Sequence, residues 1–478
     1  MKSGAREPAS ILVVLREQAD LSAAAGISDR LERRRFVYEA LRGQAEASQE
    51  PLRRRLAGSG VRFRAHWLMN MIEVDASAPL AAELASRGDV AFIARNLASA
   101  LPRPAPSPAL RLTPDESRIG IEPNVQKIRA PQLWDRGFTG QGVVVGSADT
   151  GFEWDHPALK SHYRGWTGSA ASHEYNWHDA VHDAAPGNAC GSDSPAPCDD
   201  DSHGTATAGL AVGDDGEGNR IGVAPGAALI GCRNMDHGSG TPARYTECFE
   251  WLLAPTDARG ENPRPDLGAD VINNSWSCPA VEGCTDPEIL RTVVENVRAA
   301  GVAVVVAAGN GGNRCFEISE APSIYEASIT VGATDLSDRI AAFSSFGPVA
   351  VDGSNRLKPD LCAPGVNVRT AAPGGGYTPS FSGTSAAAPH VTGAFALLWS
   401  AEPSLAGRVG ESQEVLQLSA VHRTIRIDCG GDPGAAVPNP IFGWGRIDVE
   451  AAAGGDSLRP LPSLPDPRPP PRPVSPRS

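Results

Sequence analysis

The sequence predicts an α/β fold with a mainly parallel central sheet, preceded by a small α+β unit. From about residue 116 onward, short apolar segments alternate with helix-like segments. Continuous apolar strands separated by helices are typical of a parallel sheet that is covered on both faces. A proline-rich segment at 102–108 separates this region from the first hundred residues. A chain of 478 residues is also long enough for two or three units, one of them large.

Residues 1–100 are expected to form the small α+β unit. Its expected elements are strands at 11–15, 67–74 and 90–93 and helices at 28–56 and 80–86. The prolines that follow can form neither a helix nor a strand ladder, so residues 101–118 are predicted to be a linker.

The larger unit is expected at 119–455. Its predicted strands are 143–145, 228–230, 271–272 and 302–308, and its predicted helices are 205–212, 245–253 and 288–300. The final residues, 456–478, are rich in Pro and Arg and are predicted to be a disordered tail.

The charge of the chain limits the kinds of partner. A net charge of −13 argues against nucleic acid. Residues 1–110 hold 16 Lys and Arg against 12 Asp and Glu, a net +4, so the remainder carries −17. A basic front beside an acidic body favours attraction between the two, although solvated arginine-rich helices explain the same composition. No apolar run approaches the roughly 20 residues that span a membrane.

The location of the protein is indicated by its cysteines. The chain begins without the apolar stretch of a secretory signal, so export is either absent or directed by a segment outside this sequence. Six of the nine cysteines form three close pairs: Cys190 and Cys198, Cys232 and Cys248, and Cys278 and Cys284. Such pairs favour disulfides over metal ligation, which usually shows Cys-x-x-Cys or adjacent Cys and His. A secreted or periplasmic protein is therefore expected. The sequence leaves the disulfide connectivity undetermined, and the odd number of cysteines leaves at least one thiol unpaired.

Three short motifs, in the order Asp, His, Ser, carry the chemistry. Asp149 follows an apolar strand, His203 begins the helix-like run His-Gly-Thr-Ala-Thr-Ala-Gly, and Ser385 lies in Gly-Thr-Ser-Ala-Ala-Ala-Pro. Together they supply a carboxylate, a proton acceptor and a nucleophile, which acyl transfer from a peptide bond requires. Each alone has an ordinary explanation, as a turn Asp, a surface His or a helix-capping Ser.

The surroundings of the serine and a fourth motif favour the catalytic interpretation. Pro389 is tolerated only in the first turn of the helix that follows, so Ser385 is predicted to lie at the amino end of that helix, where the dipole favours negative charge. Asn310 ends an apolar strand, and its side-chain amide could donate to a developing oxyanion. A turn asparagine is the structural alternative.

The chain resembles the subtilisin-like serine proteases, or subtilases, over roughly residues 120–455. The motifs that carry the resemblance are Asp149-Thr150-Gly151, His203-Gly204-Thr205, Gly309-Asn310 and Gly383-Thr384-Ser385, with Gly222-Val223-Ala224-Pro225-Gly226 and Lys358-Pro359-Asp360 between them. Within the family, the segments 175–179, 232–236 and 272–276 look most like the bacillopeptidase F group. The resemblance implies a three-layer subtilisin-like fold.

The resemblance also implies a serine endopeptidase that forms an acyl-enzyme and is made as a zymogen. Asp149 would orient, His203 would act as general base and then acid, Ser385 would attack, and Asn310 would hold the oxyanion. The substrate would be a protein or a peptide. The residues expected to bind it are Ser275, Trp276, Ser277, Ala308 and Gly309. A buried core position is a nearly equal interpretation of Trp276. Residues 1–100 would be an inhibitory propeptide acting in cis, and the enzyme itself would remove it by cleavage between residues 95 and 120.

Three positions depart from the family pattern. Ala206 replaces a usual second His that is generally a supporting residue. Ala386 replaces the Met that usually follows the nucleophile, so the enzyme is expected to tolerate peroxide. Ala158 stands where many relatives carry a calcium-binding Asp. No cofactor is expected to be required for the chemistry, and structural calcium cannot be assigned to residues. The run 199–201 is better explained as solvated, or as support for His203, than as a calcium cage.

Two other functions fit parts of the sequence. His178 and His182 have the i, i+4 spacing of a zinc metalloprotease helix, but such enzymes carry Glu rather than Asp after the first His. A catalytically impaired binding protein would keep the fold without the reaction, and Ala206 and Ala386 leave that interpretation open. All four catalytic residue types are present, which favours an active enzyme.

Overall fold

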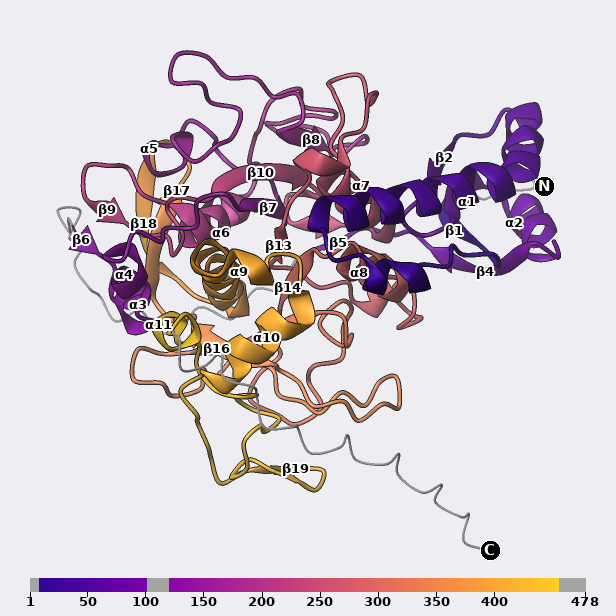
Figure 1. Cartoon of the computed structure of the whole chain (residues 1–478). Coiled ribbons are helices and arrows are strands. Elements are labelled where there is room, and N and C mark those ends of the chain that lie inside the picture. The colour runs from indigo at the N-terminus through magenta and orange to yellow at the C-terminus, as the bar shows by residue number, and fades with distance from the viewer. Residues whose placement is uncertain (1–7, 101–119, 455–478) are drawn as a thin grey trace, which may run out of the picture.

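The computed structural model describes residues 8–100 and 120–454, which form two packed units (Figure 1). The predicted linker at 101–118 and the predicted tail at 456–478 lie outside the described residues. None of the described helices combines the length and the apolar character that a membrane crossing requires.

The larger unit is built around a seven-stranded sheet in the order β16-β15-β14-β13-β7-β10-β8. Its strands are β7 (Val144–Asp149), β8 (Trp177–Asp179), β10 (Ala228–Arg233), β13 (Val271–Asn274), β14 (Ala303–Ala307), β15 (Ile329–Thr334) and β16 (Leu361–Pro364). Every neighbouring pair in this sheet is parallel, which confirms the predicted parallel sheet.

Helices cover both faces of this sheet, because successive strand residues point to opposite sides. In β14, Ala303 and Val305 belong to one buried core, and Val304 and Val306 belong to another. The first core contains α6 (His203–Val212) and α9 (Thr384–Ala401), and the second contains α7 (Pro242–Leu253) and α8 (Arg291–Ala299). The unit therefore has the three layers that the sequence predicts (Figure 1).

Further short elements lie outside this framework, in both units. The helices are α3 (Pro123–Lys127), α4 (Ala130–Trp134), α5 (Pro157–Lys160), α10 (Val409–Leu418) and α11 (Val449–Ala452), with 3-10 turns η1 (Ser22–Gly26), η2 (Pro265–Leu267), η3 (Ala280–Glu282) and η4 (Pro403–Leu405). The strands are β5 (Ser99–Ala100), β6 (Gly120–Ile121), β9 (Asn219–Arg220), β11 (Met235–Asp236), β12 (Ser239–Gly240), β17 (Val368–Ala372), β18 (Gly376–Phe381), β19 (Asp428–Cys429) and β20 (Asp432–Pro433).

The front unit is a four-stranded antiparallel sheet in the order β2-β3-β1-β4, with two helices. Its elements are β1 (Ala9–Leu15), α1 (Arg30–Ser59), β2 (Phe63–His66), β3 (Met71–Ala76), α2 (Ala78–Ala85) and β4 (Val90–Arg95). The Asp29 side chain accepts the N–H groups of Leu31 and Glu32 at the start of α1, and Gly60 ends this helix in the left-handed region.

The two units share a core and buried ion pairs. Leu12 and Val14 of β1 belong to the same core as α7 and α8, whereas Val13 packs within the front unit. The buried Arg34 guanidinium of α1 lies 2.9 Å from Asp270 Oδ1 in the larger unit. The front unit is thus held by apolar packing on one face of its sheet and by charge along α1.

Four disulfides link eight of the nine cysteines. The three close pairs of the sequence are bonded as Cys190–Cys198, Cys232–Cys248 and Cys278–Cys284. The fourth bond joins Cys315 to Cys429 across 114 residues, a pairing that sequence spacing does not indicate. Cys362 is the free thiol, and burial raises its pKa well above the usual value.

Candidate active site

The site residues come from separate parts of the sequence and meet at one edge of the central sheet. Asp149 is the last residue of β7, and Ser275 and Asn310 follow the ends of β13 and β14. Parallel strands place their carboxyl ends at the same edge. His203 and Ser385 are the first and second residues of α6 and α9, so both helices begin there.

Asp149 and His203 form a buried hydrogen-bonded pair. His203 Nδ1 lies 2.7 Å from Asp149 Oδ1, and the Asp149 side chain is fully buried. The Thr150 N–H donates to Asp149 Oδ1 at 2.7 Å, and the Thr207 hydroxyl donates to Oδ2 at 3.2 Å. The carboxylate is therefore fixed, and it favours the tautomer with the proton on Nδ1, which leaves Nε2 to accept a proton.

The environment of His203 raises its pKa. Burial alone would lower it, but the charge and hydrogen bond of Asp149 outweigh burial, with smaller contributions from Asp201 and Asp199. The imidazole also packs edge-on against Phe381, with ring centroids 5.5 Å apart. The site therefore stabilises the imidazolium that forms when His203 takes a proton.

Asp199 holds the start of α6, the helix that carries His203. Its Oδ2 accepts the N–H and the hydroxyl of Thr205 at 2.8 and 2.5 Å. Its Oδ1 accepts the Thr150 hydroxyl at 2.8 Å and the Ser202 N–H at 2.9 Å. These bonds satisfy N–H groups that lack partners in the first turn of a helix. Asp199 thus links the turn after Asp149 to the helix of His203.

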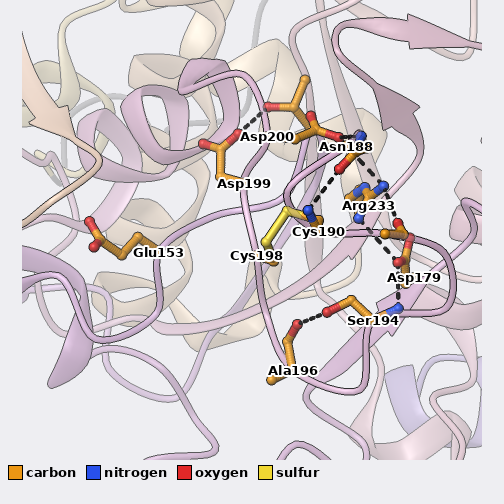
Figure 2. The surroundings of a disulfide bond; sticks show 12 residues. Glu153, Asp179, Asn188, Cys190, Ser194, Ala196, Cys198, Asp199, Asp200 and Arg233 are labelled. Atoms are coloured by element: carbon orange, nitrogen blue, oxygen red, sulfur yellow. Dashed lines mark hydrogen bonds and ion pairs between the residues drawn. A yellow bond between two sulfur atoms is a disulfide. The ribbon is translucent and has the colours of Figure 1, made fainter. Parts of the chain in front are cut away.

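A disulfide-bonded loop keeps Asp199 in this position (Figure 2). Cys198 directly precedes Asp199 and is bonded to Cys190. A Cβ added to Gly151, which has φ 99°, would lie 1.8 Å from the Cys198 carbonyl oxygen, so the loop packs directly on the turn after β7. Farther along the loop, the Gly191 carbonyl accepts a hydrogen bond from Arg233 at 2.8 Å. The loop therefore has little freedom to move away from the site.

Ser385 exchanges two hydrogen bonds with Ser275. The Ser385 hydroxyl donates to the Ser275 carbonyl at 3.0 Å, and the Ser275 hydroxyl donates to the Ser385 carbonyl at 3.0 Å. The nucleophile candidate thus points to Ser275 rather than to His203 in this structure. Catalytic hydrogen bonds of free enzymes are often loose and tighten only with substrate.

The prediction that Pro389 lies in the first turn of its helix is wrong. The helix α9 begins at Thr384, so Pro389 lies in its second turn. Proline has no N–H, and the carbonyl four residues earlier, that of Ser385, therefore lacks its helical donor. The Ser275 hydroxyl supplies the missing donor. The proline is tolerated because a side chain from the adjacent strand end replaces the helical bond.

Asn310 is oriented by the first residue of α9. The N–H and the hydroxyl of Thr384 donate to Asn310 Oδ1 at 2.9 and 3.0 Å. Because a backbone N–H only donates, the atom it contacts must be the amide oxygen, and Nδ2 is the donor of this side chain. The Ser385 N–H, near the start of the helix, likewise lacks an acceptor within α9. These two groups are the types of donor that an oxyanion requires.

The residues expected to bind substrate lie on both sides of Ser385. Ser275 and Ser277 follow β13, and Gly309 donates its N–H to Thr384 Oγ1 at 3.2 Å. Trp276 is buried, stacks on Tyr245 with centroids 3.8 Å apart, and donates to the Ala148 carbonyl. Its side chain thus occupies the core, which was the alternative interpretation.

Sequence reasoning missed one edge of the site. Strand β12 (Ser239–Gly240) pairs antiparallel with β5 (Ser99–Ala100) at the end of the front unit. The Leu97 N–H also donates to the Glu282 carbonyl at 2.8 Å. A peptide segment in extended form is thus bound along the larger unit by main-chain bonds. A Ser-Gly pair carries no apolar signal, so only the pairing reveals this edge.

The three departures from the family pattern, Ala158, Ala206 and Ala386, are all buried. Among the described residues, Asp200, Asp236 and His237 bring possible metal ligands within 4.8 Å of one another. The Asn188 amide already donates to both carboxylates, and Arg233 lies 3.4 Å from Asp200. Protein donors therefore already contact both carboxylates.

The helix required by the metalloprotease interpretation is not formed. His178 lies on the strand β8, and His182 lies in the following loop. Both Nε2 atoms contact Glu247, at 2.8 and 3.0 Å. Burial raises the pKa of Glu247, but the two histidines and Arg64 hold it far below its usual range. The i, i+4 helical arrangement of the two histidines is therefore wrong.

Comparison with known proteins decides the family. Residues 140–445 match the Subtilase family, which is more than half of the chain. The chain belongs to the subtilase family. Bacillopeptidase F of Bacillus subtilis (strain 168) is 41% identical over 311 residues, which are 63% of this chain and 20% of that relative. The major intracellular serine protease of the same organism is 32% identical over 310 residues, 64% of this chain and 82% of that protein. Subtilisin E is 31% identical over 282 residues, 59% and 61% of the two chains.

Membership of the subtilase family confirms the resemblance inferred from the motifs and the three-layer fold. The identity to Bacillopeptidase F supports the narrower resemblance to that group. This chain spans only about a fifth of the length of Bacillopeptidase F.

Proposed function

We propose that the protein is a serine endopeptidase that cleaves proteins or peptides through an acyl-enzyme. The observation that carries this proposal is the meeting of Asp149, His203, Ser385 and Asn310 at one sheet edge, with the first two joined at 2.7 Å. Membership of the subtilase family supports the same reaction.

The proposed reaction uses the geometry of each group. His203 Nε2 takes the proton of the Ser385 hydroxyl while Ser385 Oγ attacks the scissile carbonyl. Asp149 stabilises the imidazolium, and Asn310 Nδ2 and the Ser385 N–H receive the oxyanion. His203 then returns the proton to the leaving amine, and water releases the acyl group by the same steps. No cofactor takes part in this chemistry, and a structural calcium ion is not assigned to any residues.

We also propose that the front unit is an inhibitory propeptide, removed by the enzyme itself. Its last described strand, β5, lies along β12 as a bound peptide would. The side chain of Asn96 also accepts the Ala243 N–H at the start of α7 at 3.0 Å. Cleavage would fall between residues 95 and 120, largely outside the described residues. Four disulfides favour secretion or a periplasmic location.

A serine-directed fluorophosphonate tests the reaction. The purified chain should take up one label on Ser385 and hydrolyse casein, and a chelator should leave both unchanged. The Ser385→Ala variant should do neither and should accumulate as the unprocessed chain in a protease-free host. Casein hydrolysis without labelling contradicts the proposed mechanism, as does hydrolysis that the chelator abolishes while circular dichroism shows an unchanged fold. Equal processing of Ser385→Ala contradicts removal by the enzyme itself.

A further inference from the structure

Two segments flank the position where a substrate would meet Ser385. The segment after β13 is joined to α9 through the bonds between Ser275 and Ser385. The segment after β14 is joined to it through Gly309 and Asn310, which both bond to Thr384. The subtilase resemblance implies that the side chain preceding the scissile bond binds between these two segments, which follow the adjacent parallel strands β13 and β14.

A carboxylate lies at the far end of the first segment. The Ser277 hydroxyl donates to Glu320 Oε2 at 2.5 Å. Ser277 is two residues beyond Ser275, and an extended chain covers about 7 Å in that distance. The carboxylate of Glu320 is thus separated from the nucleophile by about the length of a lysine or arginine side chain.

The backbone around Glu320 is anchored on both sides. The Cys278 N–H donates to the Ala321 carbonyl at 2.6 Å, which ties this segment to the chain that follows Ser277. The Glu320 carbonyl accepts both the N–H and the hydroxyl of Ser323, at 3.1 and 2.7 Å. A carboxylate on such a fixed segment is held in place before a ligand arrives.

The charge of Glu320 is not met by a basic side chain. Within residues 8–100 and 120–454, no ion pair joins it to Lys or Arg, and its side chain is half-buried. Its acidic neighbour is Glu282, which accepts a hydrogen bond from Tyr245 at 3.1 Å. Burial raises the pKa of Glu282 to about 9, and the negative charge of Glu320 adds to this rise. The surroundings therefore favour a cation that enters from outside the protein.

We infer that Glu320 is a specificity-determining residue that selects lysine or arginine as the residue preceding the cleaved bond. This inference rests on the proposed endopeptidase function. The ammonium or guanidinium group of the substrate would lie against the carboxylate, with the Ser277 hydroxyl orienting it. Substrates with an acidic residue at that position would be rejected by like charge.

Matched peptide anilides that differ only in the residue before the scissile bond test this inference. The residues are Arg, Lys, Phe, Ala and Glu, and kcat/KM is measured for the protein as purified. We expect Arg and Lys to exceed Phe by about 100-fold, and Glu320→Gln to reduce that ratio by about 10- to 100-fold. Glu320→Lys should shift preference toward Glu. The control is Glu326→Gln, six residues away, an exposed carboxylate paired with Arg356, which should keep the ratio.

Fluorophosphonate labelling of Ser385 separates the outcomes. If labelled protein cleaves the Phe or Ala substrate with the same kcat/KM as the Arg substrate, the proposed specificity of Glu320 is overturned, but the endopeptidase function is not. An unchanged Arg-to-Phe ratio in a fully labelled Glu320→Gln variant does the same. Absence of both labelling and hydrolysis of every substrate overturns the proposed function, and the specificity with it.

Discussion

The hydrogen bond that Ser275 provides to the Ser385 carbonyl should contribute to stability only because Pro389 cannot provide one. Replacing Ser275 with Ala removes the donor and leaves a buried acceptor without a partner, which costs about 1–3 kcal/mol. Replacing Pro389 with Ala restores an N–H four residues after Ser385, and that N–H can donate to the same carbonyl. In the Pro389→Ala background, the cost of Ser275→Ala should therefore fall by about 1 kcal/mol.

The assay is a double-mutant cycle of urea unfolding, carried out in a Ser385→Ala background so that autolysis is absent. That background removes Oγ and keeps the carbonyl at the centre of the cycle. Ser275 also accepts a hydrogen bond from Asn273 at 3.0 Å, but this loss occurs in both backgrounds and cancels in the cycle. Additive costs, with no coupling beyond about 0.3 kcal/mol, would refute this exchange of donors between Ser275 and residue 389.

Three further outcomes are expected. Asp149→Asn should lower kcat by about 10⁴-fold. Asp149 raises the pKa of His203, and His203 must be neutral to accept a proton. The acid limb of the pH–rate profile of Asp149→Asn should therefore move to lower pH. An acid limb that stays in place or moves to higher pH contradicts the pairing. With Ala386 beside Ser385, activity should survive mild peroxide, and rapid loss with cysteines already oxidised argues otherwise. Glu250→Ala should raise the rate of amide hydrogen exchange in the front unit by about 100-fold, because the Glu250 carboxylate accepts two N–H groups in the turn before β3. An unchanged exchange rate in this unit would count against that role.

The sequence indicates four strands of the central sheet, β7, β10, β13 and β14, because they are buried on both faces, but it does not indicate β15 or β16, which are equally buried. The apolar run that becomes β14 (Ala303–Ala307) is continuous, and its ends are close to those predicted. Strands whose sequence mixes apolar and polar residues are not detected, because they lack such a continuous apolar run. The edge strand β8 (Trp177–Asp179) is three residues long and carries a His and an Asp, and β2 (Phe63–His66) alternates apolar and basic residues. Neither has enough apolar character to be distinguished from a loop.

The residues and contacts of the site also differ in how well the sequence predicts them. Motifs that carry a reacting group, such as those of Asp149 and His203, are readable because the chemistry restricts the residue type. Contacts that depend only on backbone or on distance are not readable. The pairing of β12 with β5 uses main-chain atoms, and the disulfide from Cys315 to Cys429 spans 114 residues. The hydrogen bond between Ser277 and the Glu320 carboxylate is equally hard to predict, because 43 residues separate the two and no local pattern marks the contact.

The opposite net charges of the two units explain less of their association than the specific contacts between the units do. At physiological ionic strength, charges more than about 8 Å apart are largely screened, so the excess of positive charge at the front steers the units without holding them. The buried pair of Arg34 with Asp270 is different, because water and salt do not reach it. Asp270 also accepts the Val144 N–H at the start of β7 at 2.9 Å, so the front unit is attached to the strand that ends in Asp149. The specific position of these charges, rather than their sum, determines how the two units are joined.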